Sequence, residues 1–221
     1  MSAVATELLL GEASSPAFAE LLRPEPLPNG AEAEERFVCC GVSWLRYLKL
    51  DQALGDDRPG PRFYYLDGDL EIMTTSTEHE RVKKWIGGFL EIYFEEIGPD
   101  VVPRGQATMR LALKEAGAEP DESWCLGAEK EFPDLVLEIA LTSGGVSKLE
   151  VCRRFKVTEV WLWRRDGLAV FALDPRKETY ERVVRSRLLP KLDIGLLERS
   201  VAMGSWREAR RVFRAAITAG S

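Results

Sequence analysis

Histidine is almost absent from this sequence of 221 residues, which narrows the chemistry available to it. A single histidine, His79, excludes zinc sites built on histidine pairs and any catalysis that needs two histidines. The four cysteines lack the C-x-x-C spacing of metal knuckles. Two of them, Cys39 and Cys40, are adjacent, which suits neither a metal site nor a disulfide framework. We therefore expect a reduced, cytoplasmic protein.

Long apolar runs and glycine-rich phosphate loops are also missing. No apolar stretch approaches the ~20 residues that a membrane-spanning helix needs, so we expect a soluble protein without a membrane partner. The absence of a glycine-rich phosphate loop disfavours an enzyme that hydrolyses nucleotides.

The charge of the chain is −6 and is unevenly distributed. Residues 1–35 hold seven acids against one base and carry all of this charge, whereas residues 36–147 are acidic and residues 148–221 are basic. Because residues 1–35 are rich in Ala, Glu and Pro and show no sustained period, we expect a disordered acidic tail, with order beginning near Phe37. A basic segment beside an acidic one suits a phosphate ligand and a metal site on one domain.

Hydrophobic periodicity predicts a single α/β domain after the tail. Asp67-Gly68-Asp69 between two apolar runs indicates a hairpin, and Ser43 is a plausible helix N-cap. Residues 55–60 have the composition of a loop. The expected helices are 42–48, 77–97, 146–155 and 206–217, and the expected strands are 63–66, 70–73, 108–113, 122–126, 134–140, 159–163, 168–173 and 180–184. This order indicates a central mixed β-sheet flanked by helices.

Two acids and one lysine could form a reactive centre. Asp121 stands where a loop enters one predicted strand, and Glu138 stands near the end of the next long strand. If these strands are neighbours, the two carboxylates could bind one Mg²⁺ ion. Lys148 begins the following helix and could place an ammonium beside them. Asp134 is too far along the strand, ~13 Å from Glu138, and is expected to fix the strand start or a nearby loop.

Several stretches between Val42 and Pro190 match a known family in order. The matching runs are Val42-Ser43-Trp44, Tyr65 to Met73, Thr77 to Glu80, Glu119 to Ser123, Pro133 to Ile139, Thr142 to Gly145, Lys148 to Glu150, Val157 and Glu159 to Trp161. In these runs the chain resembles the Uma-type restriction endonuclease family, a branch of the PD-(D/E)XK nuclease superfamily.

The resemblance implies a restriction-endonuclease-like core, a mixed sheet flanked by helices, and we expect the nuclease domain to span residues 36–221 with the C-terminal helix. It also implies an endodeoxyribonuclease that uses Mg²⁺, with Mn²⁺ as an alternative. Asp121 corresponds to the aspartate of the superfamily motif and Glu138 to its second acid, and both would bind the metal. Ala140 stands where the superfamily has its lysine, and Lys148 occupies the displaced position.

The superfamily often takes a further acid from its first core helix, and three adjacent residues compete for this role. Motif position favours His79 and Glu80, whereas helical phase favours Glu78 or His79. A buried, hydrogen-bonded histidine at a helix start is an equally good interpretation of His79.

Two functions follow as hypotheses. The first is a metal-dependent DNA endonuclease, for which a homodimer would help to cut both strands. The alternative is a catalytically degenerate nuclease fold that acts as a nucleic-acid-binding or interaction module, as Ala140 suggests. Two basic stretches could contact DNA phosphates, although a solvated helical face is the more common explanation. They are Arg153 to Lys156 and the helix with Arg207, Arg211 and Arg214.

Overall fold

A computed structural model describes residues 34–55, 61–141 and 144–219 of the chain. These residues lie in one unit, Ala33–Ser221. Most of the predicted acidic tail, most of the predicted loop at 55–60, and Thr142 and Ser143 of the family motif lie outside the described residues. The last two residues assigned to the tail, Glu34 and Glu35, are described, and both make contacts with the rest of the unit.

The larger sheet has six strands in the order β11-β10-β9-β8-β7-β4. Only the pairing of β8 with β9 is parallel, and the other pairs of this sheet are antiparallel. Its strands are β4 (Val101–Pro103), β7 (Glu122–Leu126), β8 (Leu135–Ile139), β9 (Glu159–Arg164), β10 (Gly167–Asp174) and β11 (Thr179–Val183). The predicted mixed sheet is therefore confirmed.

A second sheet, which the sequence analysis did not separate from the first, has five antiparallel strands in the order β1-β3-β2-β6-β5. Its strands are β1 (Arg36–Cys39), β2 (Arg62–Leu66), β3 (Asp69–Met73), β5 (Met109–Leu111) and β6 (Ala116–Ala118). The predicted hairpin joins β2 to β3 through Asp67 and Gly68. Both have positive φ, as a two-residue turn of this kind requires.

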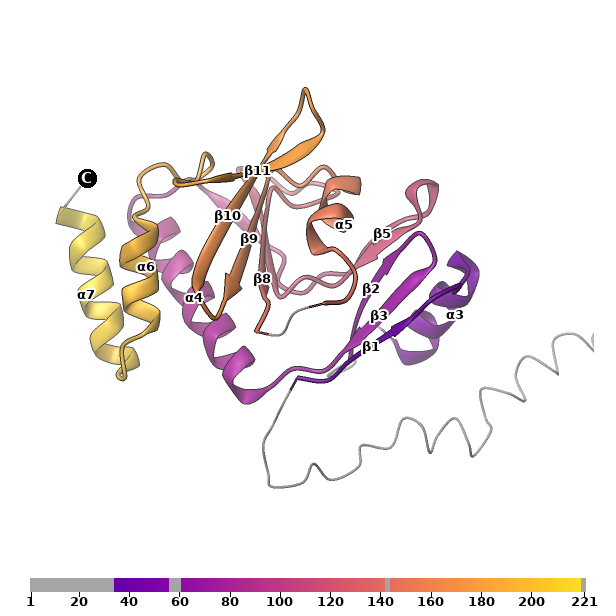
Figure 1. Ribbon diagram of the computed structural model, residues 1–221. Helices are drawn as coiled ribbons and strands as arrows, with labels where there is room; N and C mark the ends of the chain where they lie inside the picture. Colours follow the sequence, from indigo (N-terminus) through magenta and orange to yellow (C-terminus); the bar gives the residue numbers. More distant parts are fainter. Residues whose placement is uncertain (1–33, 56–60, 142–143, 220–221) are drawn as a thin grey trace, which may run out of the picture. The chain divides into compact units, whose positions relative to one another are not determined.

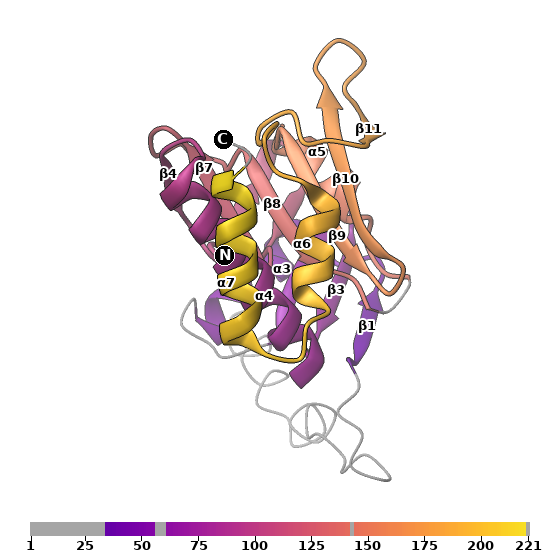
Figure 2. The same ribbon diagram turned by 90° about the vertical axis from the view of Figure 1, so that its left-hand side faces the viewer.

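Strand β8 is buried on both faces, and the alternation of its side chains between these faces decides where Glu138 points. Leu135, Leu137 and Ile139 belong to a core shared with α4 (Thr77–Glu96), α6 (Ile194–Val201) and α7 (Trp206–Ala219). Figures 1 and 2 show these three helices on one side of the larger sheet. Val136 packs on the opposite side, in a core with α5 (Lys148–Arg154) and the smaller sheet. Glu138 alternates with the first set and therefore points toward the smaller sheet.

The helix α4 begins where the sequence predicts. The Ser76 side chain caps it by accepting a hydrogen bond from the backbone N–H of His79, at 3.1 Å. Its apolar stripe includes Val82, Ile86 and Phe89, all in the core. The first predicted helix also forms, as α3 (Trp44–Leu54) with Ser43 as N-cap, but it is longer than predicted. No helix in the described part of the chain combines the length and the apolar character needed to cross a membrane.

Candidate functional site

Asp121 and Glu138 occupy opposing positions on neighbouring strands. Glu122 pairs with Leu137 across β7 and β8, so the antiparallel register places Asp121 opposite Glu138. Both acids are buried. Oδ2 of Asp121 accepts a hydrogen bond from the backbone N–H of Ile139 at 2.6 Å, which fixes the carboxylate at the end of β8. The two predicted strands are therefore neighbours, as the hypothesis of a shared site requires.

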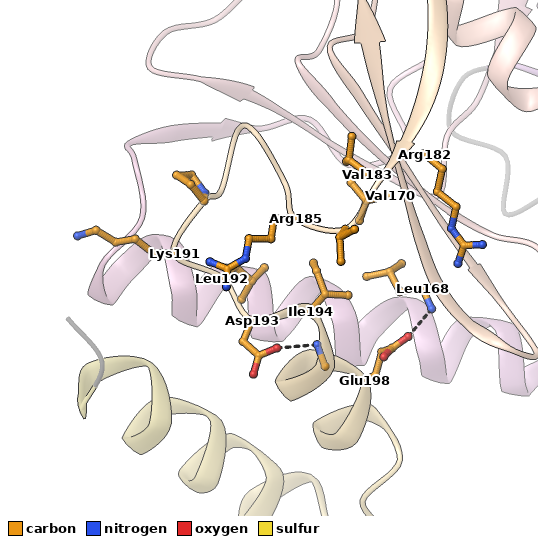
Figure 3. Close-up of a pocket in the computed structure, with 13 residues that line it drawn as sticks. Leu168, Val170, Arg182, Val183, Arg185, Lys191, Leu192, Asp193, Ile194 and Glu198 are labelled. Atoms are coloured by element: carbon orange, nitrogen blue, oxygen red, sulfur yellow. Dashed lines mark hydrogen bonds between the residues drawn. The ribbon is translucent and has the colours of Figure 1, made fainter.

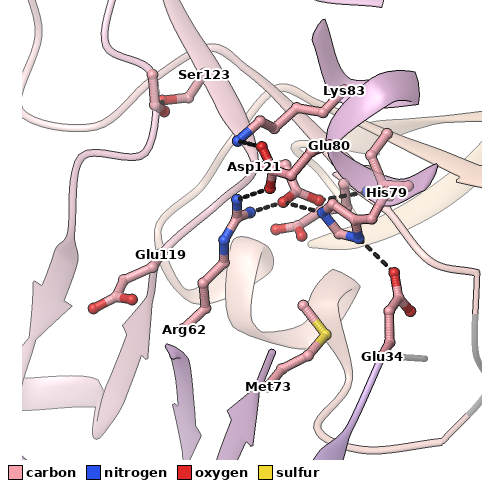
Figure 4. A network of polar contacts seen from close by, with 12 residues as sticks. Glu34, Arg62, Met73, His79, Glu80, Lys83, Glu119, Asp121 and Ser123 are labelled. Atoms are coloured by element: carbon pink, nitrogen blue, oxygen red, sulfur yellow. Dashed lines mark hydrogen bonds and ion pairs between the residues drawn. The ribbon is translucent and has the colours of Figure 1, made fainter. Parts of the chain in front are cut away.

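His79 connects Asp121 to a residue that the sequence analysis assigned to the tail. Nε2 of His79 lies 2.7 Å from Oδ1 of Asp121, and Nδ1 lies 2.6 Å from Oε1 of Glu34 (Figure 4). Both ring nitrogens therefore face carboxylate oxygens. The Glu34 side chain is only 2% exposed. The expectation that order begins near Phe37 misses this contact, because a lone acid among many others gives no sequence signal.

The three candidates at the start of α4 separate in the structure. Glu78 is 57% exposed and pairs with Arg81, so it points away from the other acids. Glu80 turns toward Arg62, whose Nη2 lies 3.2 Å from Oε1, and its Oε2 lies 2.7 Å from Nζ of Lys83. Partial burial favours the protonated form of Glu80, but Lys83 and Arg62 outweigh it and hold its pKa below the usual value. Of the three candidates, His79 and Glu80 lie in the site, whereas Glu78 does not.

Glu138 is held by a tyrosine of the smaller sheet. The hydroxyl of Tyr64 lies 2.7 Å from each carboxylate oxygen of Glu138 and 2.8 Å from the backbone carbonyl oxygen of Glu119. Burial raises the pKa of Glu138 above its usual value, and the pKa of Tyr64 lies well above its usual value for the same reason. Tyr64 thus ties the acid of one sheet to the backbone of the other.

Lys148 turns back into the site although it is displaced from the position occupied by Ala140. It is the first residue of α5, and Ser147 caps this helix. Its Nζ lies 2.8 Å from Oε1 of Glu71 and over the ring of Tyr64. Burial lowers the pKa of Lys148 to about 8, while the charges of Glu138 and Glu71 act in the opposite direction. The ammonium and Glu138 therefore share one buried environment.

Three site residues of the smaller sheet, Arg62, Tyr64 and Glu71, were not identified from the sequence. Glu71 is buried, and its Oε2 accepts a hydrogen bond from the backbone N–H of Val146 at 2.6 Å. It therefore holds both Lys148 and the segment that leads into α5. A sequence signal existed for it, because Glu71 is an acid between two apolar strand residues, Leu70 and Ile72.

The remaining polar predictions lie outside this cluster. Oδ2 of Asp134 accepts hydrogen bonds from the backbone N–H of Leu126 and from Lys130, which agrees with a role in fixing the start of β8. Arg153 and Arg154 are both hydrogen-bonded to Glu150, so their charges are partly used within the protein. This arrangement favours the interpretation of these arginines as part of a solvated helical face.

The site offers two of the oxygen ligands that a hard cation needs. Asp121 and Glu138 provide carboxylate oxygens, which Mg²⁺ prefers, and Mg²⁺ ordinarily keeps several waters or substrate phosphates. Within residues 34–55, 61–141 and 144–219, no cluster of three or more acid, cysteine or histidine side chains has the geometry to hold a metal. These residues therefore fit a site in which the protein supplies two ligands to the metal and water or substrate supplies the rest.

A cavity of about 770 Å³ lies apart from this cluster, between β10, β11 and the start of α6. Leu168, Val170 and Ile194 line it, with Arg182 and Arg185 among its basic residues (Figure 3). None of the predicted site residues lines it. This cavity therefore does not contain the predicted chemistry, whereas the polar cluster of Figure 4 contains the candidates His79, Glu80 and Asp121.

Comparison with known proteins gives one family. The family model described as "Uma2: Putative restriction endonuclease" matches residues 44–206, which is well over half of the chain. The matched range contains Asp121, Glu138, Lys148, His79 and Glu80. No curated protein matches the chain.

Proposed function

Because the chain belongs to the Uma2 restriction endonuclease family, we propose that it is a metal-dependent DNA endonuclease that hydrolyses phosphodiester bonds. The observation that carries the proposal is the convergence of Asp121, Glu138 and Lys148. The two acids lie opposite each other, and the lysine returns to the environment of Glu138 from a different element. Two carboxylates that can bind a metal ion and a nearby lysine ammonium match the requirements of phosphodiester hydrolysis.

Asp121 and Glu138 are the proposed ligands of Mg²⁺ or Mn²⁺. When bound, the cation would supply positive charge that polarises the phosphate and lowers the pKa of an attacking water. The carboxylate of Asp121 is fixed by a hydrogen bond from the backbone N–H of Ile139. The carboxylate of Glu138 is fixed by the hydroxyl of Tyr64. Rigid carboxylates of this kind keep their positions when substrate arrives.

Lys148 is proposed to stabilise the negative charge that develops on the phosphate. With a pKa of about 8, its side chain is mostly protonated at neutral pH and can donate to a non-bridging oxygen. His79 and Glu80 act behind Asp121. His79 orients this carboxylate, and Glu80 holds Arg62 beside it.

The first test is cleavage of supercoiled plasmid with Mg²⁺, Mn²⁺ or EDTA, with wild-type protein, Asp121→Ala and Glu138→Ala. We expect metal-dependent nicking in the wild type and its loss in both variants. Asp134→Ala is the matched control, because Asp134 is an acid of the same strand region whose carboxylate bonds to the end of β7 at Leu126 and to Lys130. It should cleave like the wild type once its folded fraction is taken into account.

Two other outcomes would reject the proposal. Cleavage that survives both substitutions would mean that the activity belongs to another site or to a contaminant. No cleavage, together with salt-sensitive DNA binding, would favour the catalytically degenerate binding module instead. Homodimerisation stays a prediction, and sedimentation of the protein with and without a DNA duplex would test it.

A further inference from the structure

Arg62 places a guanidinium directly against the first proposed metal ligand. It is the first residue of β2, and its side chain is only 7% exposed. Nη1 is in ion contact with Oδ1 of Asp121, and Nη2 lies 3.2 Å from Oε1 of Glu80 (Figure 4). The arginine of the smaller sheet therefore bridges the acid that precedes β7 of the larger sheet and an acid of α4.

The contact of Arg62 with Asp121 is a buried ion pair. Nη1 of Arg62 is buried beside Oδ1 of Asp121. Asp121 has good hydrogen bonds elsewhere, from Ile139 and with His79. The guanidinium thus adds positive charge beside a buried carboxylate and offsets part of the cost of burying it.

The oxygen that Arg62 contacts is needed by any cation that would bind between Asp121 and Glu138. A guanidinium and a divalent cation cannot occupy the same side of Oδ1. Both are positively charged, and two like charges in contact with one buried oxygen repel each other strongly. Binding of the cation and the contact with Arg62 are therefore in competition. Glu80 offers the arginine a second partner, which is 39% exposed and remains available when the first is lost.

We propose that Arg62 is the resident counter-ion of Asp121 in the metal-free protein and that it gives up this contact when a divalent cation binds. This inference rests on the proposed function, since it assigns a role to an arginine in the same site. After the exchange, Arg62 stays on Glu80, and the donors released from Asp121 can form paired hydrogen bonds with phosphate oxygens. Arg62 is thus a residue that restrains metal binding in the absence of substrate.

The test measures Mn²⁺ binding directly, by calorimetric titration of the full chain without DNA. Arg62→Met should bind Mn²⁺ about tenfold more tightly than the wild type, within the range usual for coupling between two groups that bind one site. Arg62→Lys keeps the charge and should stay close to the wild type. In the absence of metal, Arg62→Met should have a lower Tm than the wild type, and Mn²⁺ should raise its Tm by more.

Arg110→Met is the matched control for loss of an arginine from a buried acid. Nε of Arg110 lies 2.6 Å from Oδ2 of Asp51, which is buried as Asp121 is but belongs to α3 and is not a proposed metal ligand. Arg110→Met should lower the Tm without changing Mn²⁺ affinity. If Arg62→Met does not fold, Arg62→Gln, which keeps two donors but no charge, provides the same comparison.

The outcomes separate this inference from the proposed function. If the wild type binds Mn²⁺ and nicks plasmid, but both neutral variants of Arg62 bind Mn²⁺ equally or more weakly, the counter-ion role is wrong and the nuclease proposal stands. If only the neutral variants bind Mn²⁺, the inference holds even without cleavage by the wild type. If neither the wild type nor the neutral variants bind Mn²⁺, the exchange does not occur and the inference is overturned together with the metal-dependent function.

Discussion

Nε2 of His79 lies 2.7 Å from Oδ1 of Asp121, a contact that joins the first turn of α4 to the residue preceding β7. The second ring nitrogen lies 2.6 Å from Glu34. A histidine held in this way is part of the packing of the site as well as of its chemistry, because its removal leaves two carboxylates without their shared hydrogen-bond partner.

Replacement of this ring should therefore destabilise the protein. His79→Ala should lower the free energy of unfolding by about 2–3 kcal/mol, because it removes two buried hydrogen bonds to acids. Urea denaturation measures this change. Glu78→Ala, one residue earlier and paired only with Arg81 at the surface, should change it by less than about 0.5 kcal/mol. Equal effects of the two substitutions would contradict the placement of His79.

The pKa of Lys148 predicts a pH dependence of cleavage. Its ammonium loses the proton as pH rises through about 8, so the plasmid nicking rate should fall above this pH. Glu71→Gln removes a carboxylate that raises the pKa of Lys148, and the fall should therefore move to lower pH. Initial rates from pH 6 to pH 10 at saturating metal test this. A fall at unchanged pH in Glu71→Gln would show that another group is responsible.

The same shift has a consequence for stability. Because the pKa of Lys148 is lowered from 10.5 to about 8, the folded protein binds fewer protons than the unfolded chain between these two values. The contribution of this group therefore makes stability rise with pH across this interval. Lys148→Met should abolish that contribution. The change in unfolding free energy between pH 7 and pH 10, measured for the wild type and for Lys148→Met, tests this, because the rise should be larger in the wild type.

Two adjacent glycines offer a matched pair of substitutions. Gly144 and Gly145 both have positive φ, but a Cβ on Gly144 would meet nothing within 4 Å, whereas a Cβ on Gly145 would collide with the carboxylate of Glu71. Gly144→Ala should cost about 1 kcal/mol through backbone strain alone. Gly145→Ala should cost more and should also slow plasmid nicking, because Glu71 holds Lys148. Equal cleavage rates in the two variants would argue against this role of Glu71.

Glu159 is a buried acid whose role is structural. It accepts hydrogen bonds from the indole N–H of Trp161, the hydroxyl of Ser186 and the backbone N–H of Arg187. Glu159→Ala should therefore lower the free energy of unfolding by about 3 kcal/mol, with no change in cleavage rate per folded molecule. Thermal unfolding and plasmid nicking at low temperature test both parts, with the more exposed Glu181→Ala as a control. A loss of cleavage by folded Glu159→Ala would extend the site beyond the cluster described.

The sequence predicts the elements with a strong local signal. The hairpin at Asp67-Gly68, the helix after Ser76 and the apolar strand around Glu138 all form. The missed strands β1, β4 and β6 have three or four residues, too few for an alternation to stand out, and β6 reads Ala-Gly-Ala. The helix α6 was missed as well, and it contains Gly195 near its start.

The candidate site was partly foreseeable, and the missing part has a physical cause. Asp121, Glu138 and Lys148 stand in motifs, so sequence order alone points to them. The roles of Arg62 and Glu71 arise only when the smaller sheet packs against the face of β8 that carries Glu138. Long-range packing of this kind leaves a weak local signal, because it depends on which face of each strand is turned inward.

The division of the site between two sheets has a consequence for synthesis of the protein. The strands of the smaller sheet are complete by residue 118, but β8 gains its parallel neighbour only when β9, which ends at Arg164, has been made. Lys148 also follows Glu138 in the chain. A chain still on the ribosome, or one released early by interrupted translation, therefore carries the acids without the framework that holds them. Under the proposed function, DNA near the site of translation would meet this protein as a nuclease only after most of it has been made.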